Sequence, residues 1–561
     1  MRGIFSKDRI VAAASFNRWR VPPASMAIHL CIGSVYAWSV FNPALTKVEG
    51  VVASAADDWS LKQVVWVFTV AIAVLGLAAA FAGKWLERVG PRVVGTVSAA
   101  CWGGGFLLGG LGIHLHVLWL LYLGYGVLGG VGLGLGYVSP VSTLIRWFPD
   151  RRGMAAGMAI MGFGGGAIIA TPFKERLIVY FYQAPHYVGT EEQANLATDG
   201  GRRFAIANGQ RREVVVVAES EVEKMLVPGK AGVYLVGTGR TGVAQTFFVL
   251  GATYFVVMVA AAFSFRIPAP GWQPEGWKPS ENTARHKLIS NDHVGVDQAL
   301  KTPQFYLLWI MLCLNVTAGI GLLSVAKTMV TEIFGSSFGR LVPADFAKTY
   351  VILTGCFNML GRFFWASASD YLGRRRTFTI YFVLSMALYL SIPFIAGQAS
   401  ASPSLTWLAA YCASTLAIMT MYGGGFATIP AYIADLFGTR YVGGIHGRLL
   451  TAWSVAGVVG PWALTSLRER SMAAAIAELA GAVDPAAFAA RFGAPLSDLD
   501  ALVSQKTVTV AKLMELAPSG SADPTSTVYN STMYLMAGLL AIALVANALV
   551  RPVNPRHHIG S

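Results

Sequence analysis

Charged side chains are scarce in this 561-residue chain. Asp, Glu, Lys and Arg together make up 13% of the residues, against about 25% in an average soluble domain. Hydrophobic residues make up 55%, and the mean hydropathy is +0.54. This composition excludes a soluble protein that is merely anchored to a membrane. It indicates a polytopic membrane protein.

Cysteine is also rare, and no two cysteines form a CxxC pair. The five are Cys31, Cys101, Cys313, Cys356 and Cys412. All fall in apolar segments, so we interpret them as small core residues, neither disulfide partners nor metal ligands. The sequence also lacks a His/Glu metal pattern, a nucleophile elbow and a phosphate-binding loop. It therefore predicts neither an enzyme nor a bound cofactor.

Long hydrophobic runs, in contrast, are abundant. A helix needs about 20 apolar residues to cross a bilayer, and about twelve segments reach that length. They lie near 24–45, 62–83, 93–113, 117–145, 153–173, 245–266, 304–328, 346–368, 377–397, 405–434, 444–467 and 529–550. We predict an all-α membrane protein with twelve transmembrane helices in two six-helix bundles.

The net charge of +14 is explained by where the basic residues lie. They gather before the first span and after the second, fourth and eighth spans. Examples are Arg18 and Arg20, Lys84 and Arg88, Arg151 and Arg152, and Arg374, Arg375 and Arg376. By the positive-inside rule both termini are cytoplasmic. We expect a monomer in a bacterial-type inner membrane, in contact with lipid and not with nucleic acid, and without a cleavable signal peptide at residues 1–23.

The chain repeats itself. An acid, a glycine and an arginine recur at one spacing after the second and eighth spans: Glu87, Gly90 and Arg92, then Asp370, Gly373 and Arg375. The repeat predicts two parallel bundles that move around a central site. The predicted domains are a first bundle (1–173 plus 245–266), an external insert (174–244), a cytoplasmic linker (267–303), a second bundle (304–467 plus 529–551), another external insert (468–528) and a tail (552–561).

The repeated loop resembles the signature loop of the major facilitator superfamily. Its glycine suits a sharp turn, and its acid can pair with an arginine or with a helix N-terminus. A contact of this kind can form in only one of two conformations, and it then stabilises that conformation. We predict a gating role for Asp370, Arg374, Glu87 and Arg92. The alternative is a charge cluster that only anchors the loop at the membrane interface.

The two inserts differ in their expected structure. The first contains β-like runs at Glu213–Ala218 and Gly232–Val236, separated by Pro228 and Gly229. The second is expected to be helical, with Asp484 and Pro485 at the start of a helix. Each insert is either a small cap without a role in transport, or a segment that binds a partner or covers the outer mouth of the helix bundles.

One arginine lies in the middle of an apolar span. Arg362 stands within 350–368, with Asn358 one helical turn before it. A guanidinium does not lose its proton, and a charge at that depth costs several kcal/mol unless it is compensated. Its natural partner is an anion, so the arginine and the asparagine are predicted to bind substrate.

Several stretches resemble the oxalate/formate antiporter family of that superfamily. They are 33–41 (GSVYAWSVF), 146–153 (RWFPDRRG), 162–166 (GFGGG), 424–432 (GGFATIPAY) and 451–457 (TAWSVAG). The resemblance implies transport of small carboxylates, with an arginine of the eighth span, here Arg362, as the substrate-binding residue. The characterised oxalate carrier also uses a lysine after a Thr-Ala pair in the eleventh span, where this chain has Trp453.

With one fixed cation, a dicarboxylate is only half neutralised. We therefore expect a monocarboxylate, or a dianion that enters with a proton, carried by alternating access. Two alternatives remain: oxalate/formate exchange, and a transporter-like sensor without net transport. The sequence does not distinguish exchange from proton symport.

Aromatic residues complete the predicted site. Tyr36, Trp38, Tyr137, Tyr422 and Trp453 lie at similar depth and either wall a small cavity or serve plain helix packing.

Two further residues are candidates for coupling. His29 is the only histidine in a span placed to carry a coupling proton, although its place near the span's cytoplasmic end also suits an interfacial residue. Lys327 either supplies a second positive charge or extends to the outer interface near Glu332.

Overall fold

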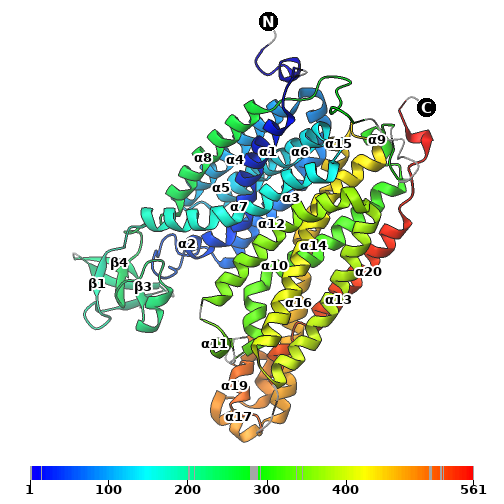
Figure 1. The fold of residues 1–561 in the computed structure, drawn as a ribbon. Helices are drawn as coiled ribbons and strands as arrows, with labels where there is room; N and C mark the ends of the chain where they lie inside the picture. Colours follow the sequence, from blue (N-terminus) through cyan, green and yellow to red (C-terminus); the bar gives the residue numbers. More distant parts are fainter. Residues whose placement is uncertain are drawn as a thin grey trace. The chain divides into compact units, whose positions relative to one another are not determined.

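The chain is described by a computed structural model that is mostly helical (Figure 1). It describes all residues except 1–2, 14, 200–201, 208, 278–287, 291, 336–337, 344, 505–507, 519–520, 522 and 560–561. The later part of the predicted linker, at 278–287 and 291, therefore lies outside the described residues.

Within that described part, eleven helices are long and apolar enough to cross a membrane. The remaining predicted span corresponds to α12 (Phe346–Leu372), which is also long but is not among these eleven. Asn358 and Arg362 lie in the middle of α12, and their polarity lowers its hydropathy. The predicted class, a polytopic helical membrane protein, is confirmed, and strands occur in the first insert.

Residue contacts divide the chain into two compact units. The first comprises Met1–Thr302, Pro430–Ser454 and Pro552–Ser561, and the second comprises Pro303–Ile429 and Val455–Arg551. Residues 430–454 thus group with the first unit, although the sequence repeat assigns them to the second bundle. The predicted domain boundaries stay a prediction, and each unit is described below by itself.

The first unit is built from closely packed helices. They are α1 (Val21–Gly33), α2 (Asn42–Leu45), α3 (Leu61–Val89), α4 (Pro91–His114), α5 (Leu118–Leu121), α6 (Gly129–Trp147), α7 (Arg152–Phe181), α8 (Val243–Ser264), α9 (Val296–Ala299) and α15 (Val442–Leu449). Helix α4 packs on α8, α1 on α7, and α3 on both α6 and α15. A π-helical turn, η4 (Tyr122–Leu128), joins α5 to α6.

Glycines allow α1 and α7 to approach closely. A Cβ atom on Gly33 would lie 2.2 Å from the carbonyl oxygen of Phe163, and one on Gly166 would lie 2.6 Å from the carbonyl oxygen of Leu30. Any larger residue would push the two helices apart. Gly162 meets Met26 and His29, and Gly166 meets Leu30 and Gly33 one turn later, so the two helices run in the same direction.

The first span is not one regular helix. After α1 the chain tightens into a 3₁₀ segment, η3 (Ser34–Phe41), with a non-helical backbone at Ala37 (φ −93°, ψ 27°). A 3₁₀ stretch in the middle of a span changes which carbonyl groups are satisfied within the helix.

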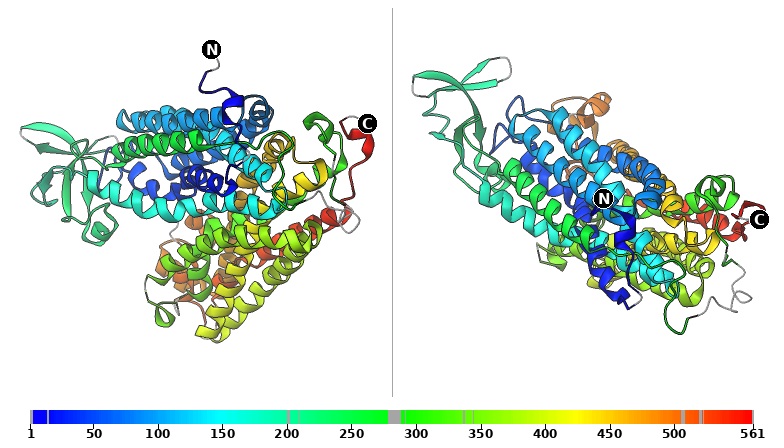
Figure 2. Two further views of the ribbon diagram at one scale, coloured as in Figure 1. Left: turned by 45° about the horizontal axis from the view of Figure 1, so that its top comes forward. Right: turned by 90° about the horizontal axis from the view of Figure 1, so that it is seen from above.

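The first insert is a five-stranded antiparallel sheet. Its strands are β1 (Tyr187–Gly189), β2 (Ala197–Asp199), β3 (Arg202–Ala207), β4 (Gln210–Val217) and β5 (Gly232–Leu235), in the order β1-β5-β4-β3-β2. The β-like runs predicted near 213–218 and 232–236 are confirmed. Figures 1 and 2 show the sheet beyond the ends of α7 and α8. Helix α7 continues past the predicted span end at 173 to Phe181, so that end was placed too early.

The second unit contains six long helices or parts of them. They are α10 (Pro303–Phe334), α12, α13 (Arg374–Ala401), α14 (Leu405–Phe437) up to Ile429, α16 (Thr451–Ala482) from Val455, and α20 (Asn530–Leu549). Helix α20 packs on α13 and α10. A short helix, α11 (Phe338–Leu341), lies between α10 and α12.

The second insert is helical, as predicted. It contains α17 (Pro485–Phe492), α18 (Leu499–Ser504) and α19 (Val510–Met514). The Asp484 side chain accepts a hydrogen bond from the amide of Ala487 at 3.2 Å, so the predicted N-cap is confirmed. Phe488 and Leu513 are central to a small apolar core that also includes residues of α16.

Candidate functional site

Arg362 is fully buried in the second unit. Its Nε donates a hydrogen bond to Oδ1 of Asn358 at 2.9 Å, one helical turn earlier on α12. The guanidinium carbon lies 5.5 Å from the centre of the Phe426 ring, which comes from α14. The neighbours of this charge thus include an amide oxygen and an aromatic face, both of which favour a cation.

Two glycines bring α12 and α14 together at this point. A Cβ atom on Gly361 would lie 2.3 Å from the carbonyl oxygen of Thr420, and one on Gly423 would lie 2.3 Å from that of Asn358. The arginine therefore lies beside a close contact between the two helices. Gly424 extends this contact to Trp365 of α12, whereas Gly425 faces Asn315 of α10.

Tyr422 is buried in the same unit. Its ring covers Gly319 of α10, where a Cβ atom would lie 2.2 Å from the Tyr422 ring, and its centre is 6.4 Å from that of Phe426. The Asn315 side chain of α10 donates to the Tyr422 carbonyl oxygen at 3.5 Å. Asn315 and Phe426 were missed by the sequence analysis. For Asn315, the sequence signal was an asparagine within a predicted apolar span.

In the first unit three of the predicted aromatic residues come together. The ring centre of Trp453 lies 5.4 Å from that of Tyr137 and 6.3 Å from that of Tyr36. Phe163 completes the cluster, at 5.3 Å from both Tyr137 and Trp453 and 5.1 Å from Tyr36. The cluster joins α6, α7, η3 and the start of α16, which are distant in sequence.

Trp38 does not belong to this aromatic cluster. It packs on Tyr125 at 4.4 Å and on Phe41 at 5.8 Å, in a second group of rings that also includes Phe247. Trp38 follows Tyr36 by two residues, and residues two apart on a helix point to different sides. Proximity in sequence therefore did not place both rings in one cluster.

Two histidines flank Tyr137. His29 is fully buried, with its ring centre 5.2 Å from that of Tyr137. His446 of α15 is also buried, at 5.8 Å from Tyr137. The prediction that His29 is the only histidine so placed is wrong, because His446 lies at the start of the predicted eleventh span. Lys327, in contrast, is exposed on α10, and Glu332 pairs with Arg468 and Tyr529.

Lys174 was missed altogether, because the predicted fifth span ended one residue before it. It lies inside α7 and has no exposed surface. Its Nζ donates to the carbonyl oxygens of Ser34 at 2.8 Å and Ala37 at 3.2 Å and lies 4.6 Å from the centre of the Phe41 ring. Among the described lysines and arginines, Lys174 and Arg362 are the two whose side chains have no exposed surface.

The two repeated loops use their charges differently. Asp370 accepts a hydrogen bond from Arg374 at 2.7 Å, and Arg374 also contacts Ser369. Glu87 pairs instead with Arg146 of α6. The predicted gating acids are thus both paired, but Glu87 is not paired with Arg92.

The second arginine of each loop caps a helix. Arg92 donates to the carbonyl oxygen of Phe263, in the last turn of α8, at 3.1 Å. Arg375 donates to that of Ala548, in the last turn of α20, at 2.5 Å. A cation at a helix C-terminus is favoured by the unsatisfied carbonyl groups there.

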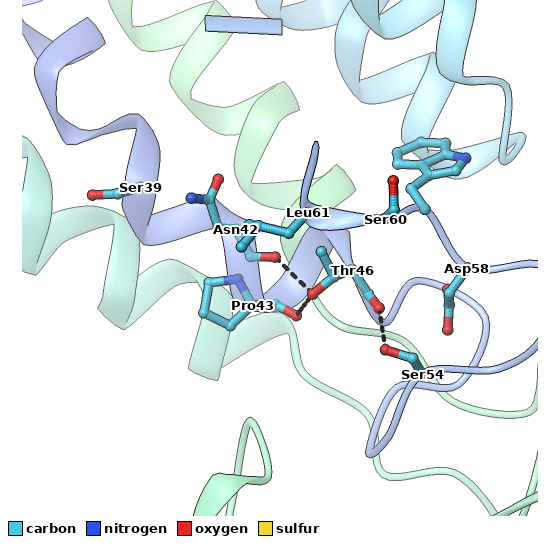
Figure 3. A pocket seen from close by; sticks show the side chains of 9 residues that line it. Ser39, Asn42, Pro43, Thr46, Ser54, Asp58, Ser60 and Leu61 are labelled. Carbon is cyan, nitrogen blue, oxygen red and sulfur yellow. Dashed lines mark hydrogen bonds between the residues drawn. The ribbon is translucent and has the colours of Figure 1, made fainter. Parts of the chain in front are cut away.

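A pocket of about 610 Å³ lies elsewhere in the first unit (Figure 3). Ser39, Asn42, Thr46 and Ser60 are among the residues that line it, and it contains none of the predicted site residues. The Asp58 carboxylate on its wall accepts hydrogen bonds from backbone amides at 2.7–3.0 Å. Without a basic lining residue, this pocket does not suit a carboxylate.

Long apolar helices with a buried cation in their middle define a polytopic membrane protein with a polar site inside the membrane. A model of the Major Facilitator Superfamily matches residues 30–189 and 231–461. The chain belongs to this superfamily of membrane transporters.

Individual relatives agree with this assignment. The chain is 23% identical over 446 residues to an oxalate:formate antiporter of Oxalobacter formigenes, covering 79% of this chain and 83% of that protein. It is 24% identical over 481 residues to the apicoplast pyruvate carrier 1 of Toxoplasma gondii, covering 75% and 78%. The crystal structure of the transporter FucP in its outward conformation matches with a TM-score of 0.53 at 11% identity, covering 94% and 98%. That likeness shows the fold, and the predicted major facilitator architecture is confirmed.

Proposed function

We propose that this protein is a secondary active transporter of small organic carboxylates, monocarboxylates foremost, and that it works by alternating access. The observation that carries the proposal is the buried guanidinium of Arg362, oriented by Asn358 and placed over Phe426. A carboxylate is the anion whose two oxygens match a planar guanidinium, because both can be bound at once.

The preference for monocarboxylates rests on Trp453. Where the resembling family's oxalate carrier has a lysine, this chain places a fully buried indole among Tyr36, Tyr137 and Phe163. An indole carries no positive charge that could neutralise a second carboxylate group. Oxalate/formate exchange is the alternative, and it is supported by one relative, while the pyruvate carrier supports the first candidate at nearly equal identity.

We assign the paired acids Asp370 and Glu87 to conformational control. We also place both termini at the cytoplasmic side of an inner membrane, with the chain acting as a monomer in lipid. These assignments follow from the charge distribution and the repeat. The two external inserts then cap the outer ends of their helices.

The test is uptake of labelled formate, pyruvate and oxalate into proteoliposomes. We expect the parent protein to accumulate or exchange at least one of them, and Arg362→Ala to bring uptake to the level of protein-free vesicles. A sensor that kept the transporter fold would bind a carboxylate without moving it. Binding without uptake by the parent, or normal uptake by Arg362→Ala, would overturn the proposal.

A further inference from the structure

The first unit contains a basic residue that the proposed site does not use. Lys174 lies two helical turns after Gly166, and the close approach of α1 and α7 at Gly33 and Gly166 places its side chain against η3. Its ammonium group contacts two main-chain carbonyl oxygens and the face of Phe41. Every contact found for this ammonium is therefore with a neutral group.

The surrounding segments contain no acid that could neutralise it. Helix α7 packs against α1, η3, α6 and α8. The titratable or basic side chains of these four segments are His29, Cys31, Tyr36, Tyr137, Arg146 and Tyr254, with no Asp or Glu among them. On α7 itself, Glu175 and Arg176 are exposed, whereas Lys174 is buried. A buried charge without a counter-ion is costly.

The carbonyl groups that hold Lys174 belong to the break in the first span. Ser34 follows the last turn of α1, and Ala37 has the non-helical backbone. In transporters with interrupted helices, such carbonyl groups at a half-helix end are where a coupling cation, a sodium ion or a proton, is held. Here the position is taken by a cation that is attached to the protein. Unlike the guanidinium of arginine, this cation can release a proton inside a protein.

We propose that Lys174 is the proton-carrying residue that couples transport to a proton gradient, and that the carrier is a proton–carboxylate symporter. In the protonated form the ammonium clamps the carbonyl oxygens of Ser34 and Ala37 and fixes the break between α1 and η3. When Nζ gives its proton to water, a neutral amine remains and the charge–dipole attraction at the break is lost. The first span can then change conformation, and reprotonation from water on the other side restores the clamp.

This inference rests on the proposed carboxylate transport, so its test uses two transport assays on the same vesicles. The first is exchange of labelled for unlabelled formate without a pH gradient. The second is net formate accumulation driven by an imposed gradient of one pH unit. A symporter with one proton per anion accumulates about tenfold under that gradient. Protein-free vesicles correct for diffusion of the neutral acid.

The variants are Lys174→Met, which cannot carry a proton, and Lys174→Arg, which cannot release one. Arg176→Met, at an exposed basic position on the same helix, is the matched control. We expect both Lys174 variants to exchange formate within about threefold of the parent and to lose the tenfold accumulation, while the control keeps both activities. If Lys174→Arg fails to fold, the methionine variant alone decides.

Three results would overturn the inference while the proposed function stands. The first is gradient-driven accumulation by Lys174→Met equal to the parent. The second is a parent that exchanges formate but does not accumulate it. The third is a folded Lys174→Met that loses both activities together, because this would assign the lysine to the structure of the helix break alone. A parent that neither exchanges nor accumulates any carboxylate would instead contradict the proposed function.

Discussion

The interior of the first unit is aromatic around Tyr36, Tyr137, Phe163 and Trp453, with a lysine held by main-chain carbonyl groups. The interior of the second unit contains a guanidinium that contacts the Asn358 amide and the Phe426 ring. Both units belong to one repeated sequence, yet the charge that suits a carboxylate is in the second. The residue that suits a proton is in the first. The proposed anion binding and the proposed proton coupling are thus assigned to different units.

The repeated loops show the same divergence on a smaller scale. Arg92 and Arg375 have the same partner in both halves, a carbonyl oxygen in the last turn of a helix. The acids Glu87 and Asp370 have different partners, because the residue after the loop glycine is Pro91 in the first loop and Arg374 in the second. A proline side chain cannot form an ion pair, and Glu87 finds Arg146 instead.

Arg362→Lys should have the largest effect. Lysine keeps the charge but loses the planar fork and the hydrogen bond to Asn358. The loss of one charge-assisted hydrogen bond, about 1.5–3 kcal/mol, corresponds to roughly a ten- to hundredfold loss of carboxylate transport. Uptake into proteoliposomes measures it, and Arg376→Lys, at an exposed arginine in the first turn of the next helix, α13, should transport normally. Wild-type transport by Arg362→Lys would show that the planar guanidinium group is not needed for carboxylate transport.

Trp453→Lys should add a positive charge to the cluster of aromatic rings formed by Tyr36, Tyr137 and Phe163. A second fixed cation favours a dianion, and a gain of about 1.4 kcal/mol raises the ratio of oxalate to formate transport tenfold. Trp453→Phe removes the indole without adding charge and should leave that ratio near its wild-type value. If the ratio is the same in Trp453→Lys as in the parent, Trp453 does not line the substrate site.

Asp370→Asn and Glu87→Gln compare the two loops directly. Each removes an ion pair that we assign to one conformational state, so turnover should fall by roughly tenfold while the apparent affinity changes little. Kinetics of uptake over a range of formate concentrations separate the two parameters. A loss of affinity with intact turnover in either variant would contradict the gating role of that acid.

Arg92→Gln and Arg375→Gln should change stability more than transport. Arg92 is largely buried and donates to two carbonyl groups, those of Ile4 and Phe263, whereas Arg375 is exposed and donates to one. We expect losses of about 1–3 kcal/mol for Arg92→Gln and up to about 1 kcal/mol for Arg375→Gln. Thermal unfolding in detergent orders the two variants. Equal midpoints would show that the two caps are equivalent.

His29→Gln should have the smallest effect. If coupling depends on Lys174, this variant keeps most of its transport and its pH profile, as does Lys327→Met at an exposed position. Uptake with and without an imposed pH gradient provides the comparison. Loss of gradient-driven uptake in His29→Gln, with exchange intact, would make this histidine the coupling residue instead.

The sequence alone determined the class of protein and much of the second unit's site. Twelve apolar segments, basic residues at alternate connections and a repeated loop are local patterns, and they indicate the membrane fold without any tertiary information. The pair Asn358 and Arg362 was equally accessible, since residues four apart on a helix face each other. The N-cap at Asp484 and the strands of the first insert were predicted for the same local reasons.

Only the tertiary structure decided which distant helices supply the remaining partners. It joined Glu87 to Arg146 and placed His446 beside Tyr137. It also showed that Lys174, which was predicted to begin the external insert, is buried in the packed interior. A run of charged residues at 174–176 looks like the end of a span, because sequence hydropathy cannot tell that one side of the helix remains buried. The lysine stays inside because glycines bring α7 against α1, and because the break in the first span presents carbonyl groups that an ammonium can bind.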